Sequence, residues 1–268
     1  MKKKIIALCV CIAMLAIALI GGTMAYFTDT KTETNVMTAG SVKIVLNEEK
    51  RGDNGMEKFD SSAITLMPMV YNENKAETNY VTDSNAKVSV FSDRFANVVD
   101  KFVSVTNDGG DDTYVRVLFA FEGTYAEVED YIGYLVNDSE ECDFSFVHEG
   151  YDAKGKLINA RGVLAPDNSV WTIAEAVYPV ALEKDKTSPY SLKQIFLAPS
   201  ATAKGFAEHF GTNYEIKVLA QATQKAGFDT AREALNISFG NVQAAVGDAD
   251  FVKDETLIEW FGLGTTTP

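Results

Sequence analysis

Alternation of apolar and polar residues with a period of two is the feature that most constrains how this chain folds. The clearest cases are residues 42–46 (VKIVL), 87–91 (KVSVF), 101–107 (KFVSVTN), 113–122 (TYVRVLFAFE) and 214–223 (YEIKVLAQAT). Such alternation, rich in β-branched and aromatic residues, is typical of β-strands. Because the turn-rich linker 108–112 (DGGDD) separates two of these segments, we expect strands 101–107 and 113–122 to form a hairpin.

The segments between these strands are shorter and less regular. We expect short helices at residues 201–210, 229–235 and 254–261, a short helix lined by Val128, Ile132 and Leu135, a polar loop at 48–62, and a short strand through Leu235, Ile237 and Phe239 that ends at Gly240. Strands dominate, and no strand–helix–strand rhythm is present. The sequence therefore predicts a mainly β fold, an antiparallel β-sandwich with inserted short helices and loops, rather than a doubly wound sheet.

The first 25 residues have the layout of a secretory signal peptide. Three lysines, Lys2 to Lys4, precede an unbroken apolar run of 16 residues from Ile5 to Ile20, and small residues follow at Thr23 and Ala25. An uncleaved membrane anchor is the alternative, but the run is shorter than the roughly 20 residues that cross a bilayer. We predict cleavage at Ala25 or Tyr26, and a protein that is secreted to the extracellular space or the cell surface.

Charge and cysteine content narrow the function classes further. The formal net charge is −14, which repels phosphate backbones and argues against nucleic acid as a partner. Cys9 and Cys11 lie in the signal segment, so Cys142 alone remains in the mature chain. Stability must then come from core packing without an intramolecular disulfide. We expect Cys142 to be a small, partly buried residue rather than a nucleophile.

The segment after the cleavage site alternates more strictly than any other. Its β-branched set is Thr28, Thr30, Thr32, Thr34, Val36 and Thr38. Two interpretations stay open: an edge strand of the chain's own sheet, or an arm that adds a strand to another copy, with Phe27 and the β-branched set to Val36 as its contact residues. The predicted organisation is a signal peptide at 1–25, an N-terminal arm at 26–40, and one β-sandwich domain at 41–268 with an insertion at about 124–200.

Several of these motifs together resemble the TasA/camelysin family. The N-terminal segments 21–30 (GGTMAYFTDT) and 38–44 (TAGSVKI) resemble the start of its members. Residues 105–109 (VTNDG) with 113–117 (TYVRV) are similar to a family hairpin, and residues 214–218 (YEIKV) with 222–228 (ATQKAGF) to a late strand and turn. Residues 124–200 match no part of the family pattern.

The resemblance implies a secreted protein of monoderm bacteria that is processed by a dedicated signal peptidase. It further implies a jelly-roll-like β-sandwich that self-associates into fibres of the extracellular biofilm matrix, alone or with an accessory matrix subunit. In such fibres the mature N-terminal segment of one subunit completes a sheet in the next. This agrees with the alternating arm at residues 27–38, which the spacing alone predicts.

Some members of the family are described as surface metalloproteases, so a camelysin-like cell-surface metalloendopeptidase is the alternative function. Zinc hydrolases use about three protein ligands, commonly two histidines one helical turn apart with a glutamate between them. The chain has only His148 and His209, in different segments, and neither has a second histidine at that spacing. The sequence therefore predicts no catalytic residues and no cofactor, with His148 and His209 as the candidate zinc ligands.

The linker at 107–112 is the other place where metal ligands gather. Asn107, Asp108, Asp111 and Asp112 offer the hard oxygen ligands that calcium prefers. Their order fits no known calcium loop, so a solvated turn is the favoured interpretation. Arg116, which alternates with Val115 and Val117, is expected on the opposite face of its strand, paired with a carboxylate.

Overall fold

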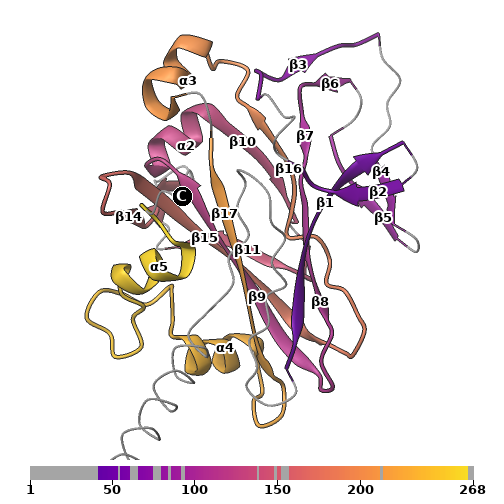
Figure 1. The fold of residues 1–268 in the computed structure, drawn as a ribbon, viewed down its shortest axis with the longest axis vertical. Helices are drawn as coiled ribbons and strands as arrows, with labels where there is room; N and C mark the ends of the chain where they lie inside the picture. Colours follow the sequence, from indigo (N-terminus) through magenta and orange to yellow (C-terminus); the bar gives the residue numbers. More distant parts are fainter. Residues whose placement is uncertain are drawn as a thin grey trace, which may run out of the picture.

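Figure 1 shows the computed structural model, in which long strands form the main sheet. The structure describes residues 42–264 except 54, 61–65, 75–79, 84–85, 92–93, 138, 148–149, 152–156 and 212–213. In the larger sheet, β9 (Thr113–Glu122) lies between β15 (Val170–Leu182) and β17 (Ile216–Gln224), and both pairings are antiparallel. The far side of β15 pairs with β11 (Asp143–Phe146) and β14 (Gly162–Leu164).

A second group of strands faces the first. It contains β1 (Ile44–Gly52), which pairs with β2 (Gly55–Lys58) and β8 (Phe102–Asn107), and β16 (Leu192–Leu197), which pairs with β7 (Val99–Asp100) and β10 (Ile132–Val136). Ser188 N and Ser191 N donate to the carbonyls of Val105 and Val103, at 2.8 and 2.9 Å. These bonds connect β8 to the segment that leads into β16. The sheet β2-β1-β8 and the sheet β10-β16-β7 therefore form one layer.

Three small antiparallel pairs complete the described strands. They are β3 (Val70–Tyr71) with β6 (Phe95–Ala96), β4 (Tyr80–Asp83) with β5 (Ala86–Ser89), and β12 (Gly150–Tyr151) with β13 (Leu157–Asn159). The mainly β, antiparallel architecture that the sequence predicts is confirmed.

Burial on both faces of β9 explains its nearly unbroken apolar sequence. The set Val115, Val117, Phe119 and Phe121 packs into the core between the two layers, together with residues of β1, β8 and β16. The alternate residues Leu118 and Ala120 face the opposite side, under α5 (Asp254–Phe261), and Tyr114 lies under α4 (Ala231–Phe239). The molecule therefore has two β layers and a cover of helices on the outer face of the larger sheet (Figure 1).

Two sequence predictions about the strands are wrong. Strands β8 and β9 do not form a hairpin, because β8 pairs with β1 and β9 pairs with β15 and β17. The linker 108–112 instead crosses from one layer to the other. The loop expected at 48–62 is largely a hairpin, since β1 extends to Gly52 and β2 follows it. Both of its faces are at least partly exposed, so it carries no apolar periodicity that would reveal strands.

Two predictions about helices also need correction. The strand expected through Leu235, Ile237 and Phe239 belongs to α4, which the Thr230 side chain caps and which ends at Gly240 with a φ of 83°. Ile237 is 68% exposed, so the three alternating residues do not share one buried face. The helix expected to include Ile132 and Leu135 is shorter, because α2 (Tyr125–Tyr131) ends where β10 begins.

Other helices agree with the sequence. A helix at 201–210 is confirmed as α3 (Ala203–Phe210), and one at 254–261 as α5. The span 124–200, which matches no family pattern, contributes β15 and β16 to the two layers. Over the described part of the chain, no helix is both long and apolar enough to span a membrane.

Candidate functional site

The turn at residues 108–112 is organised by a buried asparagine. Asn107 Nδ2 donates to the carbonyls of Asp111 and Leu182, at 2.8 and 2.9 Å, and its Oδ1 accepts from Gly109 N at 3.0 Å. Asn107 itself is fully buried. Residues 105–109 (VTNDG), which resemble part of the family hairpin, therefore help to connect the two layers.

The carboxylates of Asp108 and Asp112 in this turn have different partners, and Asp111 is bonded through its backbone. Asp108 pairs with Lys43, Asp112 Oδ2 lies 3.9 Å from Lys225 Nζ, and the Asp111 carbonyl accepts from Thr113 Oγ1 at 3.0 Å. Among the residues that the structure describes, no three His, Cys, Asp or Glu side chains lie together as a metal-binding group. The structure thus does not bring Asp108, Asp111 and Asp112 together as ligands.

His209 lies on α3 and is paired with a carboxylate of α2. Its Nδ1 is 2.9 Å from Glu127 Oε1, and its ring centroid is 5.0 Å from that of Tyr131. Burial raises the pKa of Glu127, but hydrogen bonds from Thr124 and His209 outweigh it, so this pKa lies below its ordinary value. Glu127 also closes the capping box that begins α2. His148, the second predicted histidine, lies outside the described residues.

The predicted arm and cleavage site also lie outside the described residues. This applies to Ala25 and Tyr26 and to the assembly residues Phe27, Thr28, Thr30, Thr32, Thr34 and Val36.

Cys142 is buried at 2% exposure, and burial raises the pKa of its thiol to about 12. Cys142 is thus more deeply buried than the partly buried residue that the sequence predicts.

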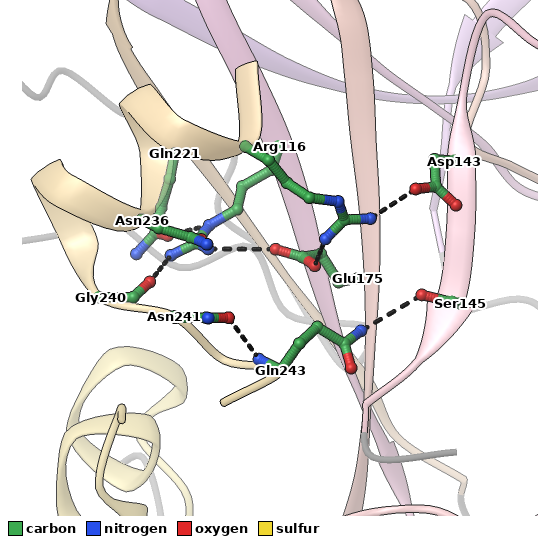
Figure 2. Close-up of polar contacts among 10 residues, drawn as sticks. Arg116, Asp143, Ser145, Glu175, Gln221, Asn236, Gly240, Asn241 and Gln243 are labelled. Carbon is green, nitrogen blue, oxygen red and sulfur yellow. Dashed lines mark hydrogen bonds and ion pairs between the residues drawn. The ribbon is translucent and has the colours of Figure 1, made fainter. Parts of the chain in front are cut away.

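Arg116 organises a buried polar network on the outer face of the larger sheet (Figure 2). Its Nη1 lies 3.0 Å from Glu175 Oε1 on β15, its Nε donates to Gln221 Oε1 on β17 at 2.8 Å, and its Nη2 donates to the carbonyl of Gly240 at 3.1 Å. The predicted carboxylate pairing of Arg116 is confirmed. Its side chain has no exposed surface, and burial lowers its pKa while Glu175 opposes that shift.

The network extends through Glu175 to a second arginine. Arg232 of α4 donates from Nη1 to Glu175 Oε2 at 3.0 Å, and its Nη2 pairs with the Asp143 carboxylate of β11. Asn236 of α4 also accepts from Arg116. Polar contacts thereby join α4 to β9, β11, β15 and β17. The contacts of Arg232 with Glu175 and of Arg116 with Asn236 hold the helix on the sheet. The signal for it in the sequence is the charged Glu175 within the apolar run of β15.

Two further titratable groups with shifted pKa values lie elsewhere, Lys101 buried and Glu122 partly buried. Lys101 Nζ is 2.6 Å from Glu48 Oε1, and burial lowers its pKa to about 8. Glu122, at the end of β9, accepts from Glu215 N at 2.9 Å, and burial raises its pKa to about 7. Sequence reasoning identified neither, because both depend on partners from distant segments.

One flank of the sandwich has strand edges without a described partner strand. Of the described strands, β17 pairs only with β9, so its other edge lies at the end of the sheet. In the facing layer, β2 pairs with β1 only from Glu49 to Gly52, which leaves the first part of β1 paired with β8 alone. β1 and β17 contact each other, and Ile44 and Val218 share one core. We call this region the open flank.

These residues define an antiparallel β-sandwich with a helical cover and an open flank. Residues 1–53 match the model of a family described as Camelysin metallo-endopeptidase. The match confirms the camelysin/TasA resemblance over those residues, and this family consists of extracellular or cell-surface proteins. Searches of curated proteins and of solved structures gave no match.

Proposed function

We propose that the protein is a secreted structural subunit of extracellular fibres of the biofilm-matrix type, and that copies assemble by N-terminal strand addition. The observation that carries this proposal is the open flank, where β17, nine residues long, has a neighbour on one side only among the strands that the structure describes. A sheet edge presents backbone N–H and C=O groups that another strand can pair with. The family match at residues 1–53 includes the alternating arm.

The core beside the open flank suits an added strand. Ile216, Val218, Ala220 and Ala222 alternate along β17 and all point into the core between the layers. The arm offers a matching period-two set of β-branched residues from Thr28 to Val36. Placed beside β17, this set continues the inner face, and the charged residues Asp29, Lys31 and Glu33 face outward.

Deleting residues 27–38 from the mature protein tests the proposal. We expect the deletion to abolish fibres in electron micrographs while the melting temperature of the globule stays unchanged. Thr32→Pro should weaken assembly strongly, because proline removes a ladder donor and restricts the preceding residue. Lys31→Ala is the matched control and should assemble normally, since an outward charge contributes at most about 1 kcal/mol.

The same series also tests the internal edge-strand interpretation. If the arm pairs within its own chain, Thr32→Pro lowers the melting temperature of the monomer. A destabilised monomer without a specific loss of polymerisation would refute strand donation. The dedicated signal peptidase and an accessory matrix subunit are partners that this proposal includes, and co-expression with and without each of them shows whether fibre formation requires it.

A camelysin-like cell-surface metalloendopeptidase is the second candidate, favoured by the description of the matched family. Such an enzyme would use the two candidate ligands His148 and His209 and would lose activity when metal is removed. We expect the purified mature protein to cleave no unstructured polypeptide above background, and to keep its fold and its fibres in EDTA. Proteolysis that EDTA and His209→Ala both abolish would establish the enzyme instead.

A further inference from the structure

We infer that the link between Asp108 and Gly109 is a site of spontaneous backbone rearrangement to isoaspartate, and that Asn107 holds it unreactive in the folded protein. Asp108–Gly109 is the only Asp–Gly pair in the sequence. The inference concerns a covalent modification of the turn at 108–112 and does not depend on the proposed function. It is supported by the bonds of the two groups that would react, the Gly109 nitrogen and the Asp108 carboxylate.

The rearrangement uses groups of the chain and water alone. The Gly109 nitrogen attacks Asp108 Cγ, a C–N bond forms, and one carboxyl oxygen leaves as water with the amide proton and one proton from solvent. The product is a five-membered succinimide ring. Hydrolysis returns the water: cleavage of the new C–N bond restores aspartate, whereas cleavage of the original peptide bond leaves isoaspartate. Glycine favours the attack, because it carries no Cβ beside the nitrogen.

The nitrogen that must attack is held by a buried hydrogen bond. Gly109 N donates to Asn107 Oδ1 at 3.0 Å, and both residues are buried. The Asn107 amide is itself fixed, since its Nδ2 donates to the carbonyls of Asp111 and Leu182, at 2.8 and 2.9 Å. The nitrogen must lose its proton to attack, and a proton bound in this way is released only when the structure opens locally. Asn107 therefore keeps the nucleophile out of the reaction.

The carboxylate that would be attacked is held by a different partner. Asp108 pairs with Lys43 through its side chain, and its backbone N–H donates to the Lys43 carbonyl at 2.8 Å. Ring closure requires Asp108 Cγ to approach the Gly109 nitrogen to within about 3.5 Å in the right alignment, and the pairing with Lys43 restrains that rotation. Both side chains of the pair are more than 40% exposed, so this restraint is weaker than the one from Asn107.

Isoaspartate at this position would disturb the crossing between the two layers. It adds Cβ to the backbone, so the path from Asn107 to the start of β9 gains one atom. Asn107 N donates to the Lys186 carbonyl at 2.9 Å, and the Asp185 amide donates to the Asn107 carbonyl at 2.8 Å. Since these bonds fix the residue before the site, the longer backbone cannot keep all the contacts of Asn107. We expect the modified chain to unfold at a lower temperature.

Ageing of the mature protein at neutral pH tests the inference. Isoaspartate at residue 108 is measured in proteolytic peptides by electron-transfer fragmentation, which distinguishes it from aspartate of the same mass. We expect it to accumulate at least about tenfold more slowly in the folded parent protein than in the same protein in guanidinium chloride, because the folded chain reacts only after local opening.

Two variants of Asn107 separate the bond to Gly109 from stability in general. Asn107→Ala frees the Gly109 nitrogen and should bring the native rate to within about threefold of the unfolded rate. Asn107→Asp is the matched control, because it loses the donor bonds of Nδ2 but keeps an oxygen that accepts from Gly109, and it should stay close to the parent rate. Gly109→Ala added to Asn107→Ala should slow the reaction again, since the new Cβ hinders the nitrogen.

Equal rates in the folded and unfolded parent protein would overturn the inference. An Asn107→Ala rate no faster than the parent rate, or a folded Asn107→Asp variant as fast as Asn107→Ala, would overturn it as well. If an Asn107 variant does not fold, the parent protein decides at guanidinium chloride concentrations below its unfolding transition. Isoaspartate formation that rises in step with hydrogen exchange of the Gly109 amide would support the role of Asn107, and formation independent of that exchange would refute it.

Discussion

The pairing of Arg116 with Glu175 yields the sharpest prediction about stability. Arg116 Nη1 and Glu175 Oε1 are 3.0 Å apart, and their side chains are 0% and 2% exposed. Removing one partner of such a pair costs about 3–5 kcal/mol, because the other charge stays buried without compensation. Glu175→Gln keeps the size of the side chain but removes the negative charge between Arg116 and Arg232. We expect it to lower the free energy of unfolding by about 3 kcal/mol.

A double-mutant cycle separates the interaction energy between Arg116 and Glu175 from the energies of their other contacts. Arg116→Met alone should cost about 3–5 kcal/mol, since Glu175 then keeps only Arg232. Glu175→Leu is the second single variant of the cycle, and Arg116→Met combined with Glu175→Leu removes both charges and replaces them with apolar groups. Such a replacement is often close to neutral, so we expect the double variant to lose less than either single variant.

Urea denaturation of the mature protein, followed by tryptophan fluorescence, measures each free energy. Lys204→Ala is the control, because its pair with Glu208 on α3 is exposed and should contribute at most about 0.5 kcal/mol. Losses that simply add in the double variant would show that the two side chains do not interact energetically. That result would refute the assignment of Arg116 and Glu175 as an energetically coupled pair between β9 and β15.

Glu122 and Asn107 give further predictions. The pKa of Glu122 is raised from 4.5 to about 7, chiefly by burial, so its contribution to stability is present below pH 4.5 and is lost as the pH rises through 7. Glu122→Gln should therefore be about 1–2 kcal/mol more stable than the parent at pH 8, allowing for solvent screening, and equal to it at pH 4. Urea titrations at both pH values measure this, and a difference independent of pH would contradict it. Asn107→Ala leaves the groups that Asn107 binds without partners and should cost about 3 kcal/mol in the same assay. Asp108→Asn on the exposed side of the turn should cost less than about 1 kcal/mol, and equal losses would refute the role of Asn107.

Local patterns in the sequence predicted single elements well and their partners poorly. The strands β9 and β17 and the helix α5 follow from periodicity, because each buries a regular set of side chains. The hairpin prediction failed since a turn-rich linker indicates a reversal of the chain but not the sheet that receives the next strand. The helix expected at 229–235 is confirmed as the first part of α4, and only its extension to Phe239 was missed, because alternation of Leu235, Ile237 and Phe239 predicted a strand there.

The polar network illustrates the same limit for the candidate site. The position of Arg116 between two valines predicts a face and a carboxylate partner, and both are confirmed. Glu175 lies 59 residues away and Gln221 lies 105 residues away, so no local pattern connects them to Arg116. Strand register brings them together: Val177 and Gln221 lie on either side of Arg116 in the sheet, and Glu175 is two residues from Val177 on β15.

The crossing at residues 108–112 also determines how the molecule bears mechanical load. A pull on Val42 along the strand axis does not open the β1–β8 ladder one bond at a time. It slides β1 along β8, so the hydrogen bonds of the register from Ile44 to Glu49, which lie perpendicular to the strands, are strained together. The turn then passes tension from the end of β8 directly into β9, the central strand of the other layer. Force applied at the N-terminus is therefore shared by both layers before any strand separates.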